Sequence, residues 1–234
     1  MASPVYVFFD VDDTLVQWRA SWTEVFALAA KEAGVEVTRD QSFDAINTAF
    51  STFYSDYLSK HSASGDEEEF WLDYDGRILE MLGVKDDPRG AAARVCELLK
   101  HPDAIQLFPE VPEVLDALRD RGARLGIITG RPVAAGDLEA LGVLHYFDPV
   151  LDGLSAGEAK RVGSVIFGPA LEAVAEAGAV GWHVGDSYEH DVQAALAAGL
   201  RGVLVDRRGK HPDADCDRIT DLRGLLDLLD GAAS

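Results

Sequence analysis

Residues 5–16 read VYVFFDVDDTLV, and this stretch decides the fold. The first five residues, 5–9, are apolar and β-branched or aromatic, which is typical of a short strand buried on both faces of a parallel sheet. Three aspartates follow the strand at Asp10, Asp12 and Asp13. In open α/β sheets ligands bind beyond the carboxyl ends of the strands, so we expect Asp10 to lie at a functional edge.

Helix and strand patterns alternate downstream of residue 101. Strands are predicted at 124–128, 149–151, 180–184 and 202–205, and helices at 112–121, 134–141, 165–177 and 189–198. Such alternation is typical of βαβ units. The sequence therefore predicts the α/β class, with a doubly wound parallel sheet.

The intervening segment has a different character. Apolar residues recur at helical spacing from residue 22 to 33, behind a Ser21-x-x-Glu24 capping box. Further apolar stripes cover 43–57, 70–82 and 95–99. We expect residues 18–101 to form a small helical domain, inserted into an α/β core that consists of residues 1–17 and 102–234.

The composition is that of an ordinary globular protein, with 47% hydrophobic and 26% charged residues. A formal net charge of -20 repels nucleic acid and anionic membranes, so we expect neither as a partner. Cys96 and Cys216 are too few for a disulfide framework. The start has no basic leader, and no stretch reaches the roughly 18 apolar residues of a membrane span. We expect a cytoplasmic protein.

Polar side chains follow three of the predicted strands. They are Asp10 and Asp12 after the first, Thr129, Gly130 and Arg131 after the second, and Asp186 with the later Asp191 after the strand at 180–184. Two carboxylates about 4 Å apart repel by roughly 4 kcal/mol at an effective dielectric of about 20, so a cation must share this edge. Mg²⁺ fits best because it prefers oxygen ligands, and the sequence offers no cluster of His or Cys.

Three motifs of the chain, FFDVDDTLV, LGIITGR and VGDSYEHDVQAALAAG, resemble the successive signatures of the haloacid dehalogenase (HAD) superfamily. The resemblance spans nearly the whole chain. It implies a HAD-like Rossmannoid core, and it implies that the helical insertion is a cap that closes over the substrate.

The resemblance also implies catalytic roles. Asp10 matches the nucleophile that forms an aspartyl-phosphate, and Asp12 matches the acid/base that protonates the leaving oxygen and then activates water. Thr129 matches the hydroxyl that hydrogen-bonds the phosphoryl group, and the backbone N–H of Gly130 would add a second donor.

A magnesium site is implied in the same way. Its ligands would be the Asp10 side chain, the Asp12 backbone carbonyl and Asp186. Asp191 would support the metal from behind or join it directly.

The family also has a phosphate-binding lysine, usually in a Lys-Pro segment shortly before an Ile-Phe pair. Counting back from Phe167 puts Arg161 in this position, whereas residue type favours Lys160, and no proline follows either residue. We therefore predict Lys160 as the catalytic cation and keep both residues as candidates for phosphate binding.

Several neighbouring residues have simpler interpretations. Arg131 is expected to be a surface arginine, with contact to phosphate or substrate as the alternative, and His183 is expected to be a core histidine. Trp18 and Trp22 are expected to pack in the helical domain, with contact to the substrate as the alternative. Asp13 is expected to be structural.

These features predict a magnesium-dependent phosphohydrolase that acts on a small phosphorylated metabolite. A sugar-phosphate phosphomutase of the same superfamily, and a metal- or phosphate-binding regulatory module without turnover, are the alternatives. A dehalogenase is disfavoured because Asp12 is present, and a nucleotide-dependent oxidoreductase because no G-x-G-x-x-G follows the first strand.

Overall fold

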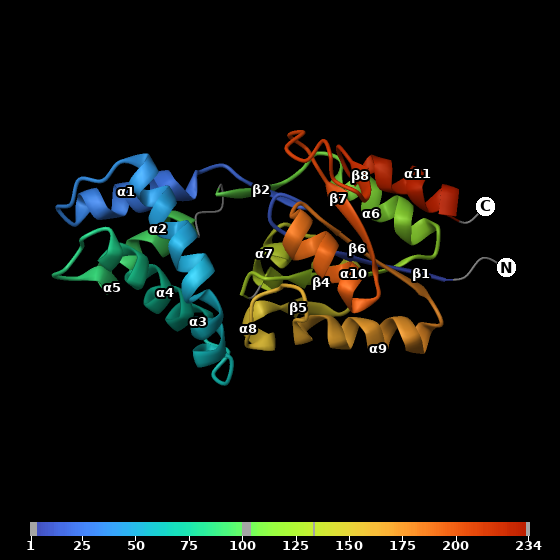
Figure 1. The fold of residues 1–234 in the computed structure, drawn as a ribbon, viewed down its shortest axis with the longest axis horizontal. Coiled ribbons are helices and arrows are strands. Elements are labelled where there is room, and N and C mark those ends of the chain that lie inside the picture. Colours follow the sequence, from blue (N-terminus) through green and yellow to red (C-terminus); the bar gives the residue numbers. More distant parts are fainter. Residues whose placement is uncertain (1–3, 100–103, 133, 233–234) are drawn as a thin grey trace. The chain divides into compact units, whose positions relative to one another are not determined.

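The chain folds into two units in this computed structural model, which describes residues 4–99, 104–132 and 134–232 (Figure 1). One unit consists of Met1–Gln17 together with Leu107–Ser234, and the other is Trp18–Gln106. The boundary predicted at residues 101 and 102 lies outside the described residues. In the structure the chain returns from the second unit to the first between Gln106 and Leu107.

A six-stranded sheet with the order β5-β4-β1-β6-β7-β8 is the centre of the first unit. Its strands are β1 (Val5–Phe9), β4 (Arg124–Thr129), β5 (Val150–Asp152), β6 (Val180–Gly185), β7 (Arg201–Val205) and β8 (Asp217–Ile219). All five neighbouring pairs are parallel. The predicted α/β class is therefore confirmed.

Helices cover both faces of this sheet. They are α6 (Val111–Asp120), α7 (Ala134–Ala140), α8 (Gly153–Ala156), α9 (Gly168–Ala177), α10 (Ala194–Ala198) and α11 (Arg223–Ala232), with short turns at Leu144–Tyr146, Val165–Phe167 and Tyr188–Gln193. Successive side chains of a strand point to opposite faces. Accordingly, Val7 and Phe9 pack in the core cluster that contains α6, α7 and α11, whereas Tyr6 and Phe8 pack with α9 and α10.

Two predicted helices begin differently from their patterns. The predicted helix at 165–177 starts as a 3₁₀ turn and becomes α9 only at Gly168. The predicted helix at 189–198 starts as a π-turn because the backbone N–H groups of Asp191 and Val192 both donate to the Ser187 carbonyl. The short strand β8 has two exposed residues out of three, so no apolar run marked it.

The second unit contains five helices among its described residues. They are α1 (Trp22–Glu32), α2 (Arg39–Thr52), α3 (Tyr54–His61), α4 (Glu67–Met81) and α5 (Pro88–Leu99). The apolar stripe at 43–57 is divided between α2 and α3 because the backbone leaves the helical conformation at Phe53, whose φ is -137°. Two short strands, β2 (Val16–Trp18) and β3 (Ile105–Leu107), pair as a ribbon where the chain passes between the units.

An aromatic cluster forms much of the core of the helical unit. Phe70 is fully buried, and its ring lies within 6 Å of those of Tyr54 and Tyr74. As expected for packing residues, Trp18 and Trp22 stack edge to face with ring centroids 5.1 Å apart. None of the helices in the described part of the chain has the length and apolar character needed to cross a membrane.

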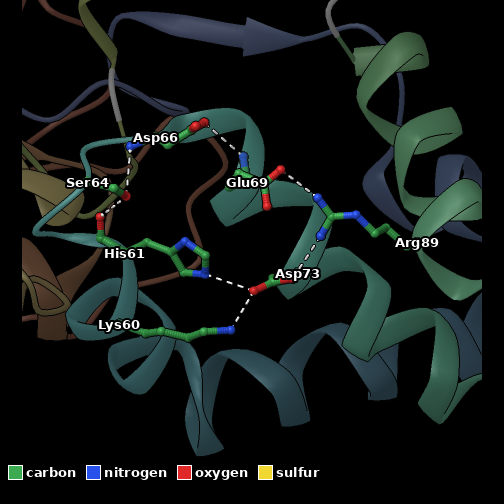
Figure 2. Close-up of polar contacts among 7 residues, drawn as sticks. All are labelled: Lys60, His61, Ser64, Asp66, Glu69, Asp73 and Arg89. Carbon is green, nitrogen blue, oxygen red and sulfur yellow. Dashed lines mark hydrogen bonds and ion pairs between the residues drawn. The ribbon is translucent and has the colours of Figure 1, made fainter.

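Asp73 on α4 is the centre of a polar network that joins three helices (Figure 2). Its Oδ2 accepts from Lys60 Nζ at 2.6 Å and from His61 Nε2 at 3.0 Å, both at the end of α3. Its Oδ1 accepts from Arg89 on α5 at 3.1 Å, and Arg89 also donates to Glu69 at 2.6 Å. Burial raises the pKa of Asp73, but the bonds from Lys60 and His61 outweigh it and hold the pKa below its ordinary value.

The loop between α3 and α4 is closed by the same network. Ser64 Oγ donates to the His61 carbonyl at 2.9 Å and accepts from the Asp66 backbone N–H at 3.3 Å. Asp66 in turn caps α4 by accepting from the Glu69 N–H at 3.1 Å. The entry angle of α4 is therefore fixed by side chains on both sides of the loop.

Asp73→Asn should lower the free energy of unfolding by roughly 1 kcal/mol near pH 7, because one carboxylate, 25% exposed, accepts hydrogen bonds from Lys60, Arg89 and His61. Urea denaturation is the measurement. The matched control is Glu80→Gln, which removes a single half-exposed ion pair with Arg77 on the same helix and should change the value by less than about 0.5 kcal/mol. Equal losses in both variants would show that the network adds nothing.

Asp75 is a second acidic group of α4, and it is only 1% exposed. Burial raises its pKa well above the ordinary value, and its Oδ1 has no hydrogen-bond partner among the described residues. A carboxyl with a raised pKa binds its proton more tightly in the folded state, so it reduces stability progressively as pH rises above about 4.

Asp75→Asn removes this ionisation, so it should raise the free energy of unfolding by roughly 1–3 kcal/mol at pH 8 and by less at pH 5. Thermal and urea denaturation at the two pH values measure the difference. Asp86→Asn, at an exposed position of the same unit, serves as the control. A gain at pH 8 no larger than the gain at pH 5 would contradict the argument.

Candidate active site

Asp10 directly follows β1 at the carboxyl edge of the sheet. Its backbone N–H donates to the Val184 carbonyl at 2.9 Å, which continues the pairing of β1 with β6. The residue is only 7% exposed. Because β1 is a central strand, the Asp10 carboxylate lies between the loops that follow β4 and β6.

Lys160 supplies the positive charge of this edge. It is 5% exposed, and its Nζ donates to Asp10 Oδ1 at 2.5 Å, to the Ile128 carbonyl at 3.1 Å and to Asp191. Arg161, the other predicted candidate, has an exposed side chain. The structure thus places Lys160 against the carboxylates, and a role of Arg161 in phosphate binding stays a prediction.

Asp191 lies in the π-turn that follows β6, and its carboxylate accepts hydrogen bonds from three partners. Its Oδ1 accepts from Lys160 and from His183 Nε2 at 3.0 Å, and its Oδ2 accepts from the Ser187 backbone N–H at 2.8 Å. It packs against Gly185 so closely that a Cβ there would lie 2.1 Å from the Asp191 Cγ. The glycine at the end of β6 therefore makes room for the carboxylate.

Three carboxylates gather at this point. Asp10, Asp186 and Asp191 each offer an oxygen within 4.8 Å of the others. Burial, together with the charge of Asp191, raises the pKa of Asp186 to about 7. Crowded, poorly hydrated oxygen ligands of like charge are what a hard divalent cation binds, so this cluster could hold a metal ion.

The buried charges also shift one another. Burial raises the pKa of Asp10 well above its ordinary value, against the effect of Lys160. Burial acts on Asp191 in the same sense, but Lys160 and His183 outweigh it, and the net pKa of Asp191 is lowered. Lys160 keeps its proton because Asp10 and Asp191 overcome the effect of burial and raise its pKa.

Arg131 is not the surface residue that the sequence predicted. Its side chain is 11% exposed, donates to Asp12 Oδ1 at 3.3 Å and pairs with Asp137 on α7. The expectation was wrong because Asp137 is the counterion that allows burial, and nothing in the local sequence marks it as a partner. Its position directly after Thr129-Gly130, at the end of β4, was the available signal.

Thr129 ends β4 and Gly130 follows it, beside these groups. Thr129 is 1% exposed, and its hydroxyl oxygen accepts from the Arg131 backbone N–H at 3.3 Å. Gly130 approaches the stem of Lys160, since a Cβ there would lie 3.5 Å from the Lys160 Cβ. Asp12, by contrast, has a side chain that is 37% exposed.

Residues 6–199 match the family model of the haloacid dehalogenase-like hydrolases. The chain belongs to this family. Every candidate site residue of this haloacid dehalogenase-like hydrolase, from Asp10 to Asp191, lies inside the matched segment.

Individual relatives of this haloacid dehalogenase-like hydrolase cover most of its length. The chain is 31% identical over 205 residues to haloacid dehalogenase-like hydrolase domain-containing protein 3 of Bos taurus, covering 84% of this chain and 80% of the relative. It is 30% identical to a phosphoserine phosphatase of Thermus thermophilus, covering 94% and 97%. A crystal structure of a HAD phosphatase from Thermococcus onnurineus matches with a TM-score of 0.67 and 24% identity over 98% and 99% of the two chains, which shows the shared fold.

His183 is a residue of this hydrolase that sequence reasoning placed correctly in the core but did not connect to the site. It is fully buried, and burial lowers its pKa, so the neutral ring donates from Nε2 to Asp191. The pattern of β6 gave no sign of this contact because Asp191 lies beyond the turn.

Gly185→Ala should lower the free energy of unfolding by roughly 1–3 kcal/mol, because the added methyl group overlaps Asp191 in a packed interior. Urea denaturation checks this. In Gly168→Ala the new Cβ would meet nothing within 4 Å, so the change should stay below about 1 kcal/mol. A Gly185→Ala protein as stable as wild type would mean that Asp191 can move without loss.

Proposed function

We propose that this haloacid dehalogenase-like hydrolase is a magnesium-dependent phosphatase that hydrolyses a small phosphate monoester through an aspartyl-phosphate at Asp10. The observation that carries the proposal is the buried Asp10 carboxylate, paired at 2.5 Å with Lys160 and surrounded by Asp186 and Asp191. The Thermus relative, named a phosphoserine phosphatase, supports phosphate-ester hydrolysis as the reaction.

Asp10 is the proposed nucleophile. One of its carboxylate oxygens attacks phosphorus, the ester oxygen departs, and the phosphoryl group is transferred to Asp10. Lys160 offsets the negative charge that gathers when a dianionic phosphate approaches a carboxylate. Without this cation, two anions would meet in a site that excludes most water.

Asp12 is the proposed general acid and base. Its partly exposed side chain can exchange protons with solvent, and Arg131 at 3.3 Å limits its orientation. It would protonate the leaving oxygen in the first step, and in the second it would take a proton from the water that attacks the aspartyl-phosphate. Acid-base assistance of this kind contributes typically 10²–10⁴-fold to rate.

Thr129 and Gly130 would bind the phosphoryl oxygens through the Thr129 hydroxyl and the Gly130 backbone N–H. Thr129 is the last residue of β4 and Gly130 directly follows it, so the sheet would hold both donors in place before the reaction begins. Arg161 remains a proposed outer contact of the phosphate.

Asp10, the Asp12 backbone carbonyl and Asp186 are the proposed magnesium ligands. Both oxygens of Asp191 already accept hydrogen bonds, so Asp191 suits a supporting role. The raised pKa of Asp186 is what a metal ligand shows when no cation is bound to it. When bound, Mg²⁺ supplies positive charge that neutralises phosphate oxygens.

The helical unit is the proposed cap. A cap that closes over the site excludes water and bulky substrates, which favours a small phosphorylated metabolite as the substrate. The proposed location of the protein is the cytoplasm. The aromatic side chains and the Asp73 network would give this cap a fixed shape.

Purified protein should release phosphate from p-nitrophenyl phosphate only when Mg²⁺ is present, and Asp10→Asn should reduce kcat by at least about 10³-fold because no covalent intermediate can form. Asp120→Asn, at an exposed position on α6, is the matched control and should retain full activity. Equal rates for wild type and Asp10→Asn would remove Asp10 from the mechanism.

A second readout separates hydrolysis from phosphoryl transfer within a sugar phosphate. Incubation with a panel of sugar phosphates should yield free phosphate, with the phosphate content of the sugar falling in proportion. An isomerised sugar phosphate without phosphate release would identify a mutase and overturn the proposed hydrolysis.

A further inference from the structure

Arg207 contacts the loop that follows Asp10 and Asp12. It follows β7 and lies outside the segment 6–199 that matches the family model. Its Nε donates to the Asp13 carbonyl at 3.2 Å, and its Nη2 donates to the Thr14 carbonyl at 2.8 Å. One guanidinium therefore binds two successive carbonyls immediately after Asp12.

Arg207 is itself held firmly. Its side chain is 15% exposed and pairs at 2.6 Å with Glu110, whose side chain is 5% exposed. Its guanidinium carbon lies 3.5 Å from the centre of the Phe108 ring. A planar guanidinium that is stacked on one face and paired at its edge has little freedom to follow a moving loop.

The loop that Arg207 binds has an unusual backbone. Asp13 has a φ of 54°, in the left-handed region that residues other than glycine seldom adopt. The N–H groups of Thr14, Leu15 and Val16 all point at the Val11 carbonyl, with distances of 3.4, 2.9 and 3.0 Å. Bonds to the Asp13 and Thr14 carbonyls restrain the peptide groups that follow these two residues, and through Asp13 they restrain the backbone at Asp12.

We propose that Arg207 is a positioning residue for Asp12. This inference rests on the proposed function, in which Asp12 protonates the leaving oxygen. Arg131 restrains the Asp12 side chain, whereas Arg207 fixes the backbone from which that side chain extends. Loss of Arg207 should therefore weaken proton transfer at the leaving oxygen more than the Asp10 attack, which depends on Asp12 only through its proposed magnesium-binding carbonyl.

A pair of substrates with different leaving groups separates these two effects. Phenyl phosphate and p-nitrophenyl phosphate share a ring, but phenolate is a poor leaving group that needs protonation and p-nitrophenolate is a good one that does not. The parameter kcat/KM covers the steps up to release of the leaving group. It therefore excludes the later role of Asp12 in activating water.

In Arg207→Lys, kcat/KM for phenyl phosphate should fall about 10–100-fold, and kcat/KM for p-nitrophenyl phosphate by less than about 3-fold. Asp12→Asn sets the reference, with a larger loss and the same leaving-group preference. Arg208→Lys is the matched control, because this neighbouring arginine is 67% exposed and lies 3.6 Å from Asp13 Oδ1. It should match wild type on both substrates.

Lysine keeps a positive charge beside Glu110, so Arg207→Lys should fold. The double variant Arg207→Met/Glu110→Gln removes both buried charges together and tests the same point without leaving either one unpaired. Equal losses on the two substrates, or no loss on either, would overturn the positioning role. An inactive wild type would instead refute the proposed function itself, so the two failures are distinguishable.

Discussion

The contact of Lys160 with Asp10 and Asp191 is the interaction on which the site depends. Two acidic residues, each at most 7% exposed, approach one buried ammonium group. Lys160 opposes the mutual repulsion of these carboxylates and their loss of hydration, both of which raise the pKa of Asp10, the proposed nucleophile. The same cation thus stabilises the folded site and would offset the charge of the proposed phosphate substrate.

Parallel strand order is what brings these groups together. Asp10 follows β1, Lys160 lies in the loop beyond β5 and α8, and Asp191 lies beyond β6, so the three are distant in sequence. Parallel strands deliver their following loops to one edge, where short local devices complete the site. The π-turn bonded to the Ser187 carbonyl aims Asp191 inward, and Gly185 leaves the space that Asp191 fills.

The two units show different ways of handling charge. In the helical unit, Asp73 is partly exposed and gathers Lys60, His61 and Arg89, so its charge is shared and its helices are joined. In the α/β unit, Arg207 and Glu110 form a pair of largely buried opposite charges. Buried pairs are strongly oriented, because any displacement leaves a charge unpaired. That rigidity suits the positioning role proposed for Arg207.

The sequence by itself determined the class of fold and the strands β1, β4, β5, β6 and β7, because apolar runs are local patterns. Its motifs also gave Asp10, Asp12, Thr129, Asp186 and Asp191 as candidates. Only the tertiary structure decided which cation of the Lys160-Arg161 pair is buried, since a one-residue shift in an irregular loop leaves no periodic signal. It also decided that the Arg131 side chain is largely buried and pairs with Asp137, and that Arg207 donates hydrogen bonds to the turn after Asp12. That last contact joins residues 194 positions apart, and long-range pairing of this kind follows from how the strands are ordered in space.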